Sequence, residues 1–118
     1  ASIGNFAETI RLGTIEMEIR EHVFGPNDSS YIESLGNLAK YYANFGNYTE
    51  AIRLGMEEIK IREKIVGLED SNYVTSLENL VSYNTELRNF DEAIQLQIKL
   101  TNIKEKILVT TILNMRIR

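Results

Sequence analysis

The chain repeats itself, and this internal repeat is the feature that most constrains its fold. Shifting the sequence by about 42 residues aligns residues 4–45 with 46–87, and roughly 20 of the paired residues are identical. A third copy begins at Arg88 and keeps the pattern as far as Ile107. A single compact globule has no reason to repeat its sequence, whereas a stack of similar units does. We therefore expect a repeat protein.

Each repeat unit contains two helix patterns. The first begins at Asn5, Asn47 and Asn89, each followed three residues later by a glutamate, a spacing typical of an N-terminal capping box. The second begins after Asp28 and Asp70, whose side chains suit the cap of a first turn. Apolar residues recur at helical spacing in both patterns, and the alternation typical of strands is absent. The sequence therefore predicts an all-α chain of about five helices.

Glycines mark most of the predicted helix ends. Gly25 and Gly67 follow the first kind of helix and Gly46 follows the second, because only glycine enters the left-handed stop conformation without cost. Arg88 stands where the last copy should have this glycine, so we expect that turn to be built differently. Val109 also replaces a stop glycine, which allows the last helix to continue toward the C-terminus.

Short loops between helices of similar length produce antiparallel hairpins, and hairpins that are apolar on two sides must stack on their neighbours. Glu58 and Arg62, one turn apart, are expected to pair on the outside of this stack. The predicted divisions of the single domain, residues 1–118, are an unpaired helix over 4–25, helix pairs over 28–67 and 70–108, and a tail over 109–118.

Composition excludes several classes of function. The 118 residues are 43% hydrophobic and 25% charged, as in one ordinary globular domain, and the net charge of −4 comes with scattered basic residues. We therefore expect no nucleic-acid partner and no membrane association. The absence of cysteine excludes disulfides and thiolate sites and favours a reducing compartment, so we predict a cytoplasmic location.

No constellation of residues indicates catalysis. His22 is the only histidine, and its equivalents in the repeat are Lys64 and Lys106, which points to a solvated outer face. The carboxylates fall at helix surfaces or turns, and no glycine-rich loop is placed to cradle a phosphate. We therefore predict no enzyme activity, no metal site and no cofactor.

The stretches "SLGNLAKYYANFGNYTEAIRLG" and "IKIREKIVG" resemble a known repeat. They are similar to the tetratricopeptide repeat (TPR) in the 42-residue form found in kinesin light chains. The resemblance extends from about residue 4 to residue 107. It implies a right-handed α-solenoid in which each unit pairs an A helix with a B helix, so that this chain opens on a B helix without its A partner. It also implies binding of a peptide or protein segment along the inner, concave wall formed by the A helices.

A polar stripe on the two A helices supplies the candidate binding residues for such a ligand. On the first A helix the candidates are Glu33, Asn37, Lys40 and Asn44, with Gly36 among them, and on the second they are Thr75, Glu78, Asn79, Ser82 and Glu86. Each asparagine amide offers donors and an acceptor, as needed to hold an extended peptide backbone, and family members resemble this chain in using groove asparagines that way. Lys40 and Gly36 have Ser82 and Glu78 as equivalents, so a ligand would be read asymmetrically. The alternative is that the stripe is merely the solvated face that every soluble helix needs.

The two ends of the stack raise a second hypothesis. The first B helix has no A helix before it, and the tail adds apolar residues to the last one, namely Leu108, Ile112, Leu113, Met115 and Ile117. These apolar faces are expected to be covered by another copy of the chain, as a homodimer through the terminal helices. The alternative to groove binding is therefore a structural or self-assembly segment of a larger protein with no groove ligand.

Overall fold

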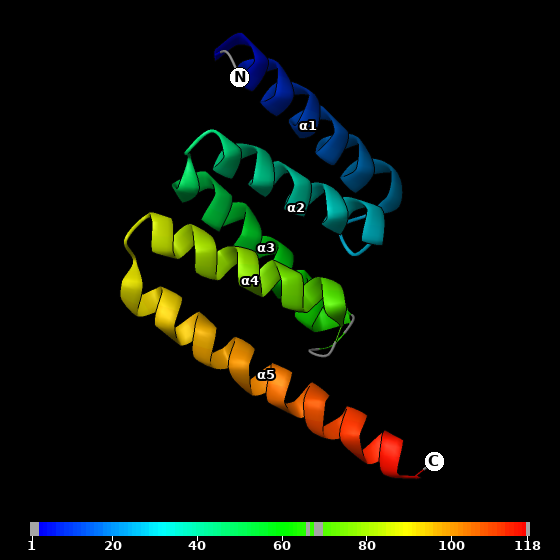
Figure 1. Ribbon diagram of the computed structural model, residues 1–118. Coiled ribbons are helices and arrows are strands. Elements are labelled where there is room, and N and C mark those ends of the chain that lie inside the picture. The colour runs from blue at the N-terminus through cyan, green and yellow to red at the C-terminus, as the bar shows by residue number, and fades with distance from the viewer. Residues whose placement is uncertain (1–2, 66, 68–69, 118) are drawn as a thin grey trace.

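The computed structural model describes residues 3–65, 67 and 70–117 and contains five α-helices and no strand within these ranges. The helices are α1 (Ile3–Phe24), α2 (Ser29–Asn44), α3 (Tyr48–Ile65), α4 (Ser71–Glu86) and α5 (Phe90–Ile117). They follow one another through an elongated stack of 55 × 36 × 21 Å, with α1 at one edge and α5 at the other (Figure 1). The predictions of an all-α chain and of five helices are confirmed.

Aspartates start both A helices, α2 and α4. The Asp28 carboxylate accepts a hydrogen bond from the amide of Ser30 at 2.8 Å. Asp70 accepts hydrogen bonds from the amides of Asn72 and Tyr73 at 2.9 and 3.2 Å. Both caps satisfy first-turn amides that would otherwise lack a partner, so the start of each A helix is fixed as the sequence predicts.

The asparagines predicted to cap the B helices differ in whether they act as caps. The Asn47 side chain accepts the amide hydrogen of Glu50 at 3.2 Å and so starts α3 as predicted. Asn89 directly precedes α5, and its side-chain nitrogen donates to Oδ1 of Asn84 at 3.3 Å. The prediction that Asn5 caps the first helix is wrong, because α1 begins upstream and Asn5 lies within its first turn.

The turn after α4 has the geometry of the turn after α2, although Arg88 replaces a glycine. The backbone angle φ is 85° at Gly46 and 65° at Arg88. The Gly46 amide donates to the Ala43 carbonyl at 3.0 Å, and the Arg88 amide donates to the Thr85 carbonyl at the same distance. The prediction that this turn is built differently is therefore wrong: the hydrogen bonds of the turn hold even an arginine in the left-handed region.

Replacing Arg88 by glycine is expected to raise the free energy of unfolding by about 0.5–1 kcal/mol, because glycine adopts this φ without steric cost. Urea denaturation followed by circular dichroism measures the change. The matched control is Arg53→Gly within α3, which is expected to lower stability by about 1 kcal/mol. A loss of stability in both variants would show that Arg88 is not strained.

Each helix packs on its neighbours in the sequence, and every extensive helix contact within the described ranges joins sequential helices. The centre of the core lies on the A helices, where Leu35 is 2% exposed and Tyr73, Leu77 and Leu80 are fully buried. Burial of these side chains is the main stabilising contribution. The α2–α3 hairpin is thus covered by α1 on one side and by α4 on the other.

Two glycines let a B helix approach the next A helix closely. A Cβ built on Gly55 would lie 2.9 Å from Cδ2 of Leu80, and one built on Gly13 would lie 3.1 Å from Cδ1 of Leu38. The third copy has Gln97 at the equivalent position, and Gln97 is exposed. The repeat therefore keeps glycine at this position where a following helix packs against it.

A polar link joins α3, α4 and α5. Tyr73 Oη and Lys99 Nζ both donate to Oε2 of Glu63, the lysine at 2.6 Å. Burial, together with the hydrogen bond to the Glu63 carboxylate, raises the pKa of Tyr73 to about 12. Burial alone would raise the pKa of Glu63, but the hydrogen bonds from Lys99 and Tyr73 lower it. At neutral pH the tyrosine therefore stays protonated and the carboxylate ionised, which is the state that keeps the link intact.

The two outermost helices carry exposed apolar side chains. On α1 these include Leu12, Ile19 and Val23, and on α5 they continue beyond Val109, because α5 runs without interruption to Ile117. Figure 1 shows the C-terminal part of α5 extending past the N-terminal end of α4, which runs antiparallel to it. Among the helices described, none combines the length and apolar character that a membrane span requires.

Candidate functional site

A cavity of about 250 Å³ lies between the A helices α2 and α4 and is called the α2–α4 cavity below. Its lining comes from α2, α3 and α4 and consists of Glu33, Gly36, Asn37, Lys40, Glu58, Arg62, Asn72, Thr75, Ser76 and Asn79. The repeat thus brings polar side chains from two consecutive units to one place. The predicted binding residues Glu33, Asn37, Lys40, Thr75 and Asn79 are among them.

The Glu58 carboxylate, on α3, is the most buried charged group of this cavity. It is 6% exposed as a residue and accepts hydrogen bonds from Arg62 Nε at 2.8 Å and from Ser76 Oγ at 2.6 Å. Gly36 makes room for it, because a Cβ built on Gly36 would lie 3.0 Å from Glu58 Oε2. Glu58 therefore ties α3 to α4 while its carboxylate lies directly against the backbone of α2.

The prediction that Glu58 and Arg62 pair on the outside of the stack is wrong. The pair exists, but its side chains are only 8% and 13% exposed. The equivalent pair on α1, Glu16 and Arg20, is more open to solvent, at 54% and 29%. The small residues that the A helices present, Gly36 above all, admit the Glu58–Arg62 pair into the stack.

Arg62 keeps donors available to the cavity. Its Nε bonds Glu58, and its two terminal nitrogens make no hydrogen bond to any residue in the described ranges. No buried side-chain nitrogen or oxygen among these residues lacks a partner, so the terminal nitrogens of Arg62 are reachable by solvent. The floor of the cavity can therefore donate hydrogen bonds to a carbonyl or carboxylate oxygen.

Asn37 and Asn79 are half-buried, and their side chains form no hydrogen bond with the described part of the chain. Asparagine is a poor helix former, so its presence at the same position of both A helices is not explained by helix stability. Lys40 on α2 and Thr75 on α4 are exposed and likewise lack side-chain partners within the described ranges. These groups can exchange solvent for a ligand without breaking an internal contact.

The remaining predicted residues lie outside the cavity lining. Glu78 pairs with α5 instead, since Lys104 Nζ donates to its Oε2 at 2.9 Å. Ser82 is exposed on α4, and Asn44 and Glu86 are exposed last residues of α2 and α4. The stripe read from the sequence is therefore longer than the cavity that the structure forms.

Sequence reasoning missed four lining residues: Glu58, Arg62, Asn72 and Ser76. Two features of the sequence could have indicated them. The first unit has Gly36 where the second has Glu78, and both units have a serine at the same repeat position, Ser34 and Ser76. A small residue on an A helix leaves space that an acidic side chain from the neighbouring B helix can occupy.

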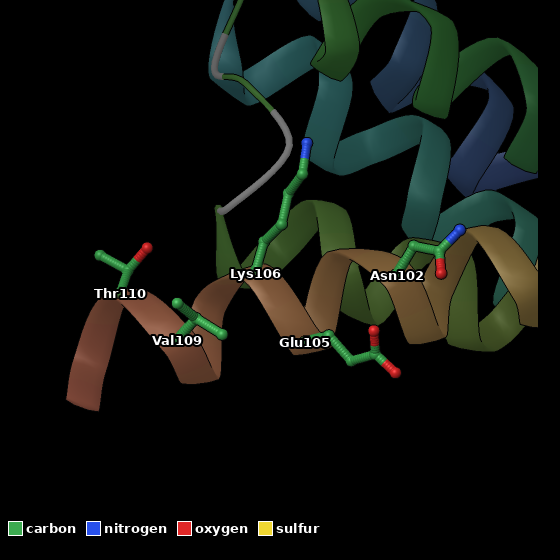
Figure 2. A pocket seen from close by; sticks show the side chains of 5 residues that line it. All are labelled: Asn102, Glu105, Lys106, Val109 and Thr110. Carbon is green, nitrogen blue, oxygen red and sulfur yellow. The ribbon is translucent and has the colours of Figure 1, made fainter. Parts of the chain in front are cut away.

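A larger depression on α5, of about 640 Å³, makes a poorer site. All of its lining residues, Asn102, Glu105, Lys106, Val109 and Thr110, belong to this single helix. Figure 2 shows the side chains of Lys106 and Glu105 pointing to opposite sides of α5. One helix cannot enclose a ligand, so these side chains do not converge on a common point. Within residues 3–65, 67 and 70–117, no group of three or more acidic or histidine side chains is placed to hold a metal ion.

Comparisons with known proteins identify the repeat. The family model described as tetratricopeptide repeat matches residues 32–72. Among solved structures, the fold is similar to that of a Podosopora anserina protein described as a kinesin light chain with nearly identical TPR-like repeats. The TM-score is 0.78 and the identity 22%, over 87% of this chain and 49% of that one, so the chain spans about half the length of that structure. No curated protein matches the sequence significantly.

The family model covers most of α2, all of α3 and the start of α4, and the structural similarity extends over 87% of the chain. These findings confirm the predicted solenoid of stacked hairpins. Residues 32–72 match the tetratricopeptide repeat, and the chain has a fold similar to that of stacked TPR-like repeats.

Proposed function

We propose that this chain is a protein-interaction module that binds an extended peptide or protein segment over the α2–α4 cavity. Tetratricopeptide repeats generally mediate protein–protein interaction or scaffolding, and the fold is typically not catalytic. The observation that carries the proposal is the pair of half-buried asparagines, Asn37 and Asn79, whose amides have no partner among the described residues.

The chemistry of the cavity suits a peptide backbone. An extended segment presents alternating N–H and C=O groups, and an asparagine amide can accept from the first and donate to the second. Asn37 and Asn79 stand on consecutive A helices, so one segment lying across them would meet both. Arg62 below and Lys40 at the side favour acceptor groups on the ligand, while Glu33 limits the net charge of the site.

The two units would not contact the ligand in the same way. The α2 side offers Lys40, with the Glu58 carboxylate against Gly36, whereas the α4 side has Ser82 in place of the lysine, outside the cavity lining, and has Glu78 engaged by Lys104. A bound segment therefore has a preferred direction. We place this module in a reducing compartment such as the cytoplasm, because its sequence uses no cysteine.

A peptide-array screen with the whole chain, repeated with the Asn37→Ala, Asn79→Ala and double variants, tests the proposal. Each substitution is expected to weaken a selected peptide about tenfold, since it removes one or two hydrogen bonds worth ~1 kcal/mol each. Alanine is the better helix former, so loss of binding cannot be attributed to loss of helix. Circular dichroism of each variant checks this directly.

Asn44→Ala is the matched control, because it removes the same amide from the same helix outside the cavity lining. It is expected to leave peptide affinity unchanged. If no peptide binds, or if the double variant binds as well as the original chain, the groove has no ligand. The chain would then be a structural or self-assembly segment.

A further inference from the structure

A heptad pattern follows the exposed face of α5, opposite its packed side. The residues of this seam are Ile94, Ile98, Thr101, Glu105, Leu108, Ile112 and Met115, which are all exposed. Their spacing alternates between four and three residues, as it does along the contact line of paired helices in coiled coils. The seam is apolar toward both ends and polar in the middle.

The seam faces away from the rest of the stack. The side of α5 that packs on α4 is formed by Leu96, Leu100 and Ile103, which are 8%, 2% and 5% exposed. Ile94 and Ile98 lie on the other side and are each 57% exposed. Two isoleucines this exposed form an apolar surface that no described helix covers.

The repeat frame does not supply a cover for this seam within the described chain. On α3 the equivalent face is covered in part, since Ile59, the equivalent of Thr101, is 5% exposed whereas Met56, the equivalent of Ile98, is 42% exposed. A fourth A helix in the same frame would be capped at Ile112, the equivalent of Asp70. Position 112 instead lies inside α5, which continues through Ile117. A further hairpin therefore does not begin where the repeat requires it.

We propose that a second copy of this chain covers the seam, with the two α5 helices packed antiparallel. Charge selects this direction. The first turn of α5 carries Asp91 and Glu92 and the last turn carries Arg116. Antiparallel pairing places these opposite charges next to each other, whereas parallel pairing places like charges together. It also sets Glu105 against the partner's Thr101 rather than against a second glutamate.

The apolar residues fall into register in the same arrangement. In an antiparallel pair, each a position of one helix faces a d position of the other. This places Ile94 opposite the partner's Ile112 and Ile98 opposite the partner's Leu108. The partner's Met115 then arrives near the start of α5. An apolar groove of about 390 Å³ lies there, lined by Val81, Thr85, Phe90, Ala93, Ile94 and Gln97. A flexible methionine side chain fits such an irregular gap.

Sedimentation equilibrium of the whole chain over micromolar concentrations tests the proposal. The original chain is expected to dimerise, and Ile98→Glu is expected to weaken dimerisation by at least about tenfold, since it places a carboxylate in the apolar part of the seam. Ile19→Glu is the matched control, because this isoleucine is equally exposed, at 56%, on the other outer helix, α1. It is expected to leave the dimer intact. A monomeric original chain, or dissociation by Ile19→Glu alone, overturns the proposal.

Engineered cysteines test the direction of pairing, because the chain contains no cysteine of its own. The variants Asp91→Cys and Met115→Cys are mixed in equal amounts and oxidised with diamide. The antiparallel dimer predicts a disulfide between the two different variants. Disulfides only within each variant would show parallel pairing and overturn the proposal. The seam does not include the α2–α4 cavity, so Ile98→Glu is expected to weaken dimerisation and to give the same result as the original chain in the peptide-binding test, whether or not a peptide binds.

Discussion

Replacing Leu54 by alanine is expected to lower the free energy of unfolding by about 3 kcal/mol, because the deletion leaves a cavity in a packed core. Leu54, on α3, is 3% exposed. Leu12 occupies the same repeat position on α1 but is 53% exposed, and its replacement is expected to cost less than about 1 kcal/mol. Urea denaturation of both variants, at one protein concentration, measures the difference.

This pair of leucines isolates the effect of the A helix that precedes each B helix. The two side chains share residue type, helix type and repeat position, and they differ in that α3 packs on the preceding helix α2, whereas no described helix precedes α1. Leu96, the third member, is 8% exposed and is expected to behave like Leu54. Equal losses at Leu12 and Leu54 would contradict a stack in which burial comes only from sequential neighbours.

Replacing Arg62 by methionine is expected to destabilise the chain by about 3 kcal/mol, because it leaves the buried Glu58 carboxylate with Ser76 as its one remaining partner. The control is Arg53→Met, which breaks the pair with Glu50 on the same helix. The side chains of that pair are 62% and 30% exposed, so the loss there is expected to stay below about 1 kcal/mol. Urea denaturation at neutral pH compares the two.

A double variant separates the lost ion pair from lost packing. The third repeat has Leu100 where the second has Glu58, and this leucine is 2% exposed, so the position accepts an apolar side chain. Combining Glu58→Leu with Arg62→Met is therefore expected to recover most of the stability lost in Arg62→Met. A double variant less stable than Arg62→Met alone would show that the uncompensated carboxylate was not the cause.

Most of the fold could be predicted because the signals were local and repeated. Asp28 and Asp70 cap the A helices as expected, and Gly46 ends α2 in the left-handed conformation. Arg88 was harder, because a glycine is sufficient but not necessary for such a turn when its hydrogen bonds form. Asn5 fits the cap pattern of Asn47, yet the sequence does not show that the helix already begins before it.

The candidate site could be predicted only on the A helices. The spacing of Asn37 and Asn79 places them on one face, and the structure brings both to the α2–α4 cavity. Glu58 and Arg62 could not be placed from spacing, because their pairing one turn apart is the same whether the pair is exposed or buried. Their burial depends on the missing side chain of Gly36, on another helix, which is a tertiary effect.

Nuclear magnetic resonance of the whole chain with an array-selected peptide tests the central claim most directly, namely that a partner binds over the α2–α4 cavity. The account predicts that the largest chemical-shift changes fall on the side-chain amides of Asn37 and Asn79 and on the backbone amides of Thr75 and Ser76. Changes confined to the exposed face of α5, with the two asparagine side chains unaffected, would contradict it.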